Sequence, residues 1–256
     1  MKKLLLGIVA LAAASAAPAV AADMPIKARP VVAAFSWQGC YFGIQGGANW
    51  GRSRHDGFPP GPIEITPYFN LSGGEAGIEY GCNYALGGGW VFGTESDFSW
   101  TNKRGSSFDT GPGGVPTFES TTRERWFSTT RIRLGMGWDR TLLYVTGGLA
   151  LARVEATLNT HLVGFPIFTE SRTLWGGTIG AGLEQIIAPN WSIKAEYLFM
   201  SFANKDYRFG NDPLVGPQGI NAQRSGVNLS DHVFRLGINY RFAECLLFCG
   251  AVVAKY

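Results

Sequence analysis

The chain has 256 residues, of which 46% are hydrophobic and 16% charged, and it contains 35 glycines. Abundant glycine combined with aromatic residues is typical of a protein built from many strands and turns, and it argues against a helical fold. The net charge of +3 is small and evenly spread along the chain, which excludes an extended surface for nucleic acid.

The first residues carry an export pattern. Lys2 and Lys3 precede an apolar run over 4–14, and the small residues 19–22 follow Pro18. This order predicts a secretory signal peptide over 1–22, because the apolar run is too short for a membrane anchor. Residues 23–35 are expected to form an extended periplasmic linker. No later apolar run reaches about 18 residues, so we predict no transmembrane helix.

Alternation of apolar and polar residues then marks strands. In the stretch 125–138, for example, Ile132 and Leu134 share one face, and Arg131 and Arg133 share the other. The same period predicts eight strands, over 38–52, 73–84, 90–101, 125–138, 142–156, 173–187, 191–202 and 231–242.

The connections between these strands alternate in length. They are short after the second, fourth and sixth strands, and long over 53–72, 102–122, 157–172 and 203–230. A barrel with both termini on the periplasmic side of an outer membrane has short periplasmic turns and long external loops. The order along this chain matches that arrangement.

A soluble up-and-down barrel of lipocalin type could hold the same alternation with its faces exchanged. Two features favour the membrane barrel. One face carries glycines and matched charges, which suit a narrow interior, and tryptophans near the strand ends suit interfacial girdles. The predicted girdle consists of Trp50, Trp90, Trp100, Trp138, Trp175 and Trp191. We therefore predict an all-β, eight-stranded antiparallel up-and-down transmembrane β-barrel over 36–242, in the bacterial outer membrane.

Several segments resemble a known family. They cover residues 36–43, 73–74, 81–84, 90–97, 129–152 and 235–242. In these segments the chain is similar to the alphaproteobacterial outer membrane immunogenic proteins, which are small outer-membrane barrels. The resemblance implies the fold and the location but says little about molecular activity. Such proteins end at the aromatic residue of the last strand, Phe242 here, whereas this chain continues as an atypical apolar tail over 243–256. A periplasmic extension, a further strand and a coding artefact all remain open for that tail.

The most specific constellation is a set of charges expected to face the barrel interior. An eight-stranded barrel is just wide enough for side chains to fill, and buried charges persist when they are paired. We therefore expect a salt-bridged plug rather than a selective pore. The expected network comprises Glu75, Glu79, Glu95, Asp97, Arg131, Arg133, Glu184, Lys194, Glu196, Arg235 and Arg241.

Cysteines and histidines offer weaker hypotheses. Cys40 and Cys82 lie at the periplasmic ends of adjacent predicted strands, where they can form a disulfide or remain as two separate thiols. His55, His161 and His232 fall on the predicted external side, as solvated residues or as part of a haem or metal site. The spacings of the cysteines and histidines predict no metal site and no cofactor.

Catalysis is not expected. Ser230, Asp231 and His232 are consecutive on one strand, so their side chains alternate between its faces and do not form a triad. The sequence thus favours a structural surface protein with a charge-plugged interior, serving envelope integrity and acting as a surface antigen. The alternatives are a small porin and a loop-based protein that binds haem or a host surface. The expected partners are outer-membrane lipid, lipopolysaccharide and the outer-membrane assembly machinery, with peptidoglycan or a host surface as further candidates and no nucleic acid.

Overall fold

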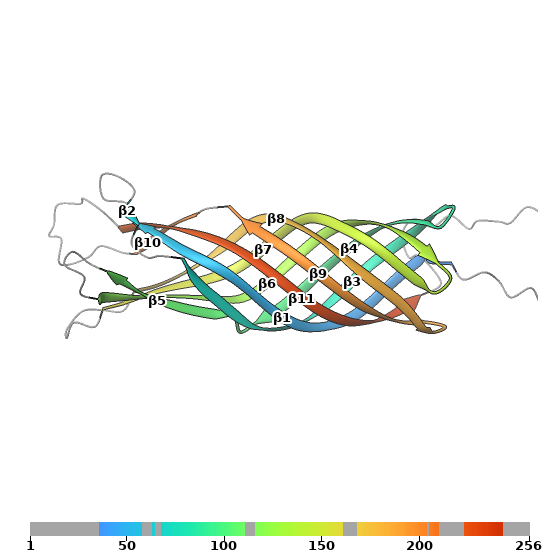
Figure 1. The fold of residues 1–256 in the computed structure, drawn as a ribbon, viewed down its shortest axis with the longest axis horizontal. Helices are drawn as coiled ribbons and strands as arrows, with labels where there is room; N and C mark the ends of the chain where they lie inside the picture. Colours follow the sequence, from blue (N-terminus) through green and yellow to red (C-terminus); the bar gives the residue numbers. More distant parts are fainter. Residues whose placement is uncertain are drawn as a thin grey trace, which may run out of the picture. The chain divides into compact units, whose positions relative to one another are not determined.

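Eight long antiparallel strands form a closed ring (Figure 1). The computed structural model describes residues 36–57, 63–64, 68–110, 116–160, 168–203, 205–209 and 223–242. In ring order the strands are β1 (Gly39–Gly57), β3 (Phe69–Gly87), β4 (Trp90–Thr101), β6 (Pro116–Trp138), β7 (Thr141–Thr160), β8 (Phe168–Ala188), β9 (Trp191–Phe202) and β11 (Gln223–Phe242). Three short strands, β2 (Ile63–Glu64), β5 (Arg104–Thr110) and β10 (Lys205–Phe209), pair with the ends of these long ones.

The ring closes because the first strand pairs with the last. β1 and β11 run antiparallel from Cys40 opposite Phe242 to Gly57 opposite Ser225. A path through direct strand partners leaves β1 at Cys40, passes Ile132 and returns to β1 at Trp50, ten residues further along. This stagger tilts the strands against the barrel axis, as closure of an eight-stranded sheet requires. The predicted fold class is confirmed.

The two faces of the wall decide between the membrane and soluble barrels. On β7, Leu143, Val145 and Leu149 are exposed by 51–66%, whereas Tyr144 and Thr146 are at most 5% exposed. Large apolar side chains project from the outer wall on all eight strands of the ring, and buried carboxylates and guanidinium groups occupy the interior. A soluble barrel would bury the apolar face, so this arrangement is that of a membrane barrel.

Tight turns join the strands at one end of the barrel, which we call the turn end. Asp139 and Arg140 link β6 to β7, and the backbone of Asp139 has a φ of 52°. The β3–β4 turn contains Gly87, Gly88 and Gly89, with φ values of 89°, 60° and 85°. Glycine adopts this left-handed region at little cost, which explains why three glycines stand together there. The opposite end of the barrel is called the loop end.

The predicted loops are too long at the loop end. Residues 102–122 contain β5 and the first part of β6, and residues 203–230 contain β10 and the start of β11. β1, β3, β7 and β8 also extend past their predicted outer limits. The strand limits were predicted from the alternation of apolar and polar residues. This alternation stops where the outer face of the wall leaves the hydrocarbon core of the membrane. Hydrogen bonding between strands needs no apolar face, so the ladders continue further out. Among the described residues, no helix is long and apolar enough to cross a bilayer.

Candidate functional site

The barrel interior holds a buried ion-pair network centred on Glu95. This β4 carboxylate lies directly opposite Arg131 of β6 in the strand register and forms an ion pair with it. Its other oxygen is 3.1 Å from Arg133 Nη1. Lys194 of β9 approaches the same carboxylate from across the barrel, with Nζ 3.1 Å from Oε1. Glu95 also accepts a hydrogen bond from the Tyr41 hydroxyl. One carboxylate therefore joins strands on opposite walls.

A second centre of the network lies around Glu196 of β9. Arg131 Nη1 is 3.0 Å from Glu196 Oε1, and Arg235 Nη2 is 2.6 Å from Glu196 Oε2. Arg235 also reaches Asp97 on the far wall, at 3.1 Å between Nη1 and Oδ1. The Tyr144 hydroxyl donates a hydrogen bond of 2.9 Å to Glu196. Since each guanidinium contacts at least two carboxylates, no single pair can separate without disturbing the others.

The network extends to both sides of these centres. Glu79 pairs with Lys194, and Arg133 Nη2 is 2.7 Å from Glu184 Oε2. Arg133 also lies over the Tyr144 ring, 4.0 Å from its centroid. The structure thus brings together nine of the sequence-predicted charges: Glu79, Glu95, Asp97, Arg131, Arg133, Glu184, Lys194, Glu196 and Arg235.

Glu75 and Arg241 lie outside this network. Glu75 is 7% exposed on β3, and none of the ion pairs between described residues includes it. Arg241 lies near the turn end, where it stacks on the Trp37 ring at 4.8 Å and donates to the Ser36 carbonyl at 3.3 Å. Both side chains face the interior, as the alternation along their strands predicts, but neither takes part in the ion pairs of the network.

An apolar cluster occupies the interior on the turn-end side of the network. It contains Trp37, Val91, Leu142, Tyr144 and Ile186. Trp37 precedes β1 and packs against Gly137, where an added Cβ would lie 2.5 Å from the indole ring. The glycine therefore leaves room for the tryptophan, which fills the mouth at this end of the barrel.

A second apolar cluster lies on the loop-end side. On β9 the inward side chains pass from Lys194 and Glu196 to Leu198 and Met200, and on β11 they pass from Arg235 to Val233. The cluster comprises Phe69, Leu71, Phe127, Ala150, Ala152, Val154, Leu174, Leu198, Met200, Phe202, Leu229 and Val233. The charged layer is therefore enclosed by apolar side chains above and below.

A second ionic cluster, which the sequence interpretation missed, lies beside the outer part of the second apolar cluster. Lys103 Nζ is 2.8 Å from Glu124 Oε2 and 2.5 Å from Asp231 Oδ1, and all three side chains are fully buried. Lys103 follows Trp100, and Glu124 precedes Trp126. The cluster thus lies beyond the girdle tryptophans, outside the stretch of wall that they bound. Lys103 fell in the predicted loop 102–122, and Glu124 fell just before the predicted strand 125–138, so no alternation assigned either residue an inward phase.

One cation faces two carboxylates in this outer cluster, so one carboxylate retains a proton. Burial raises the pKa of Glu124 to about 8, against the opposing effect of Lys103 and with a further contribution from Asp231. For Lys103, burial lowers the pKa, but Asp231 and Glu124 outweigh it and leave the pKa of the ammonium raised. At neutral pH Glu124 therefore retains its proton, next to the contact between Lys103 and Asp231.

This protonation predicts a pH-dependent stability. Between the ordinary pKa of 4.5 and the folded pKa of about 8, folded Glu124 binds a proton that the unfolded chain releases. The contribution of Glu124 to the free energy of unfolding therefore falls as the pH rises through that window. The variant Glu124→Gln cannot ionise and should lack this decline. Urea unfolding of both proteins in detergent micelles, at about pH 5 and about pH 9, measures it. Parallel pH profiles would contradict the assignment.

The six tryptophans of the predicted girdles project from the outer wall near the two ends of the barrel. Trp50, Trp100 and Trp175 project outward near the loop end, and Trp90, Trp138 and Trp191 project near the turn end. All six are 42–58% exposed. The sequence interpretation missed Trp126, which lies opposite Trp100 in the register and stacks on Phe98 with ring centroids 5.4 Å apart. Aromatic rings at both ends fix the depth of a barrel in a bilayer.

A disulfide joins Cys40 of β1 to Cys82 of β3 near the turn end. The two residues are direct cross-strand partners, and their Cα atoms are 3.9 Å apart. The bond therefore fastens the first two strands of the ring to each other. Cys245 and Cys249 lie outside the described residues.

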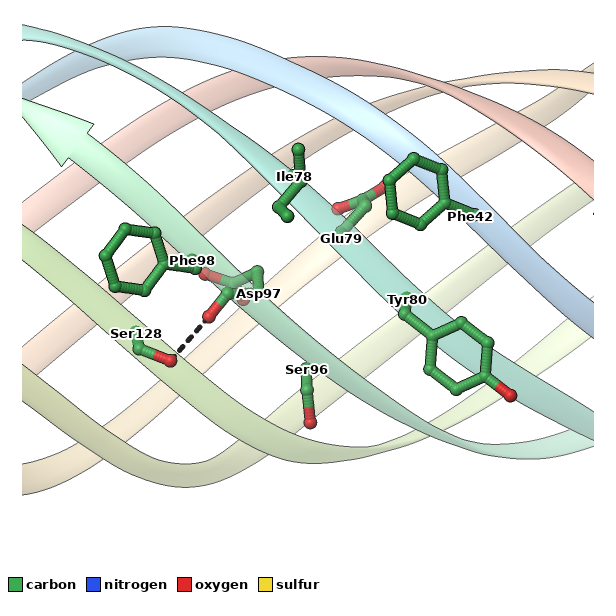
Figure 2. Close-up of a pocket in the computed structure, with 8 residues that line it drawn as sticks. All are labelled: Phe42, Ile78, Glu79, Tyr80, Ser96, Asp97, Phe98 and Ser128. Carbon is green, nitrogen blue, oxygen red and sulfur yellow. Dashed lines mark hydrogen bonds between the residues drawn. The ribbon is translucent and has the colours of Figure 1, made fainter.

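A shallow hollow of about 260 Å³ opens on the outer wall over β1, β3, β4 and β6 (Figure 2). Its apolar lining comes from Phe42, Ile78, Tyr80 and Phe98. Ser128 at its edge donates a hydrogen bond of 2.7 Å to the Asp97 carbonyl (Figure 2). Because the hydroxyl has this partner, it can face hydrocarbon without an unmet hydrogen bond.

The histidines do not form a common site in the described part of the chain. His232 projects from the outer wall, where it hydrogen-bonds the Tyr197 hydroxyl at 2.6 Å and stacks on Trp50. His161 and the side chain of His55 lie outside what the structure describes. Asp231 faces the interior and is paired with Lys103, so it does not approach His232 as a catalytic partner. No group of three or more metal-ligating side chains occurs among the described residues.

Comparisons with known proteins agree with this geometry. Residues 6–242 match the family described as the outer membrane protein beta-barrel domain. The 31 kDa outer-membrane immunogenic protein of Brucella melitensis is 32% identical, over 94% of this chain and 100% of the relative. The 22 kDa outer membrane protein of Rhizobium leguminosarum is 30% identical, over 78% of this chain and 81% of the relative. The outer membrane protease OmpT of Escherichia coli superposes with a TM-score of 0.51 at 10% identity, over 81% of this chain and 98% of that one, which shows a shared fold alone.

Proposed function

The chain belongs to the outer membrane protein beta-barrel domain family, and from that premise we propose that it is a structural surface protein whose interior is closed by its own side chains. It is a protein of the bacterial outer membrane, as its relatives are. The turn end then faces the periplasm and the loop end faces outward. The named Brucella and Rhizobium relatives are described as outer-membrane or immunogenic proteins and not as enzymes.

The filling of the interior supports this proposal most directly. Arg131, Arg133 and Arg235 are each at most 2% exposed, which supports a filled interior over a water-filled pore. A permeating ion would have to pass the Trp37 cluster, the ion-pair network and the apolar cluster around Phe127 in turn. The apolar layers exclude ions, and every charge of the network already contacts an opposite charge of the protein.

The proposal predicts that the purified, refolded protein conducts almost no current in a planar bilayer. Removal of the central pair by Glu95→Ala with Arg131→Ala should raise the conductance, since the cavity it leaves in the charged layer can take up water. Heat-modifiable migration on unboiled gels serves as the control that both proteins are folded. A large, steady conductance of the wild-type protein would refute the closed interior and favour the small porin.

Under this proposal, the protein contributes to envelope integrity and presents its loops at the surface through its rigidity and its fixed depth in the membrane, and not by catalysing a reaction. The girdles hold the barrel at a fixed depth, and the paired interior resists deformation of the wall. Under this proposal the partners are outer-membrane lipid, lipopolysaccharide and the assembly machinery that inserts the barrel. A loop-based site for haem or a host surface is a separate hypothesis that no described residue favours. His232 is the one histidine whose side chain the structure describes, and it lies beside the girdle residue Trp50.

A further inference from the structure

Arginines collect on the outer wall immediately beyond the external girdle, on β5, β6 and β7. Trp100 and Trp126 are the last cross-strand pair of β4 and β6, and β5 then continues the pairing with Arg104 directly opposite Arg123. Both arginines are exposed. Since girdle tryptophans lie at the boundary of the hydrocarbon, side chains just beyond them lie at the depth of the lipid headgroups.

The Arg104–Arg123 pair has an unfavourable charge arrangement on its own. Directly opposed residues on antiparallel strands have Cβ atoms roughly 5 Å apart, and like charges in such positions repel. The acidic residue next to them is Glu155, which is the register partner of Arg123 on β7. Its carboxylate is already bound by Arg125, with Nη2 3.0 Å from Oε2 and 3.2 Å from Oε1. Arg104 and Arg123 have no ion pair with any residue that the structure describes.

Arg153 adds a further cation to the same sector. It is the register partner of Trp126 and donates a weak hydrogen bond of 3.4 Å to the Thr173 hydroxyl. The sector therefore carries four arginines, at 104, 123, 125 and 153, against the single carboxylate of Glu155, with Glu119 four residues further out on β6. This sector thus has a surplus of positive charge.

We propose that Arg104 and Arg123, flanked by Arg153, bind a phosphate group of an anionic outer-leaflet lipid. A phosphate between the two guanidinium groups would replace their repulsion by two charge-assisted pairs, and the fork of arginine matches phosphate oxygens. The acyl chains of the same lipid would extend along the girdle and the apolar wall below it. The inference deepens the proposed lipid partnership and rests on the loop end being external, but it does not depend on whether the interior conducts.

The test uses the full-length mature barrel in phosphatidylcholine vesicles, with and without lipid A as the phosphorylated probe. Binding is followed by native mass spectrometry of the lipid retained by the protein. The variant Arg104→Gln with Arg123→Gln is expected to bind lipid A about tenfold more weakly or worse, because hydrogen bonds to charged groups are lost. The variant Arg52→Gln, an exposed arginine on the outer wall of β1, is the matched control and should bind as the wild type does.

Three outcomes would overturn the site. Equal retention by the wild type and the double variant would show that the arginine pair takes no part. Equal retention of dephosphorylated lipid A would show that the arginines do not recognise the phosphate group. Full displacement of lipid A by inorganic phosphate would show that the site binds free anions rather than lipid. If the double variant fails to migrate as a folded barrel, Arg104→Lys with Arg123→Lys replaces it. That pair keeps the charge but loses the fork, so weaker binding supports the proposal and unchanged binding contradicts it.

Discussion

Replacement of Glu95 by alanine is expected to lower the free energy of unfolding by about 3–5 kcal/mol, as removal of one partner from a buried ion pair does. Glu95 contacts Arg131, Arg133 and Lys194 and is 2% exposed. Its loss removes the one carboxylate that these three buried cations share, so each of them keeps fewer opposite charges in a site that water does not reach. Urea unfolding in detergent micelles, followed by tryptophan fluorescence, measures the change.

The control for this substitution is an ion pair of ordinary exposure. Glu170 pairs with Arg172 at 2.6 Å, with side chains 25% and 34% exposed. Glu170→Ala should cost at most about 1 kcal/mol, because solvent screens the pair and can replace it. If Glu95→Ala were no more destabilising than Glu170→Ala, the network would contribute little to holding the walls of the barrel together.

The second large effect is expected at Lys103. Lys103→Met removes the one cation of the outer cluster and leaves Asp231 as a buried, uncompensated carboxylate. We expect a loss of about 3–5 kcal/mol at neutral pH, again measured by urea unfolding. The Lys103 ammonium is fully buried in the wild-type protein, so solvent does not share its role of compensating the neighbouring carboxylates.

A double variant distinguishes charge from packing at this site. Lys103→Met combined with Asp231→Asn removes both members of the ion pair, and replacement of a whole buried pair is often nearly neutral. The double variant should therefore regain much of the stability that Lys103→Met loses. A double variant less stable than the single one would show that Lys103 acts through the shape of its side chain rather than through its charge.

Alternation along single strands made the wall of the barrel predictable. β4 and β9 begin and end at the predicted residues, since tryptophans, tight turns and a change of polarity coincide there. The inward phase of Arg131 and of Glu196 followed from the same period, because one face of each strand had to meet hydrocarbon. These features depend on neighbours in the sequence, and a single sequence contains them.

The partners of the charges depended on information that the sequence lacks. Arg235 reaches Asp97 across 138 positions of chain, and the stagger of the closed ring sets which inward residues share a level. The cluster of Lys103, Glu124 and Asp231 was missed for a related reason. Lys103 lies in the link between β4 and β5, and Glu124 lies on the extension of β6, where no alternation of apolar residues marks the phase.

The strand extensions at the loop end also determine what an antibody would meet on the cell surface. β6 continues from Trp126 to Pro116, which is roughly 30 Å of chain at about 3.3 Å per residue. It pairs with β5 from Arg123 outward and with β7 as far out as Phe118. An epitope on this rim would combine side chains from neighbouring strands that are far apart in the sequence. Antibodies raised against the folded protein should therefore recognise it poorly on a blot of boiled protein, and short synthetic peptides should compete weakly.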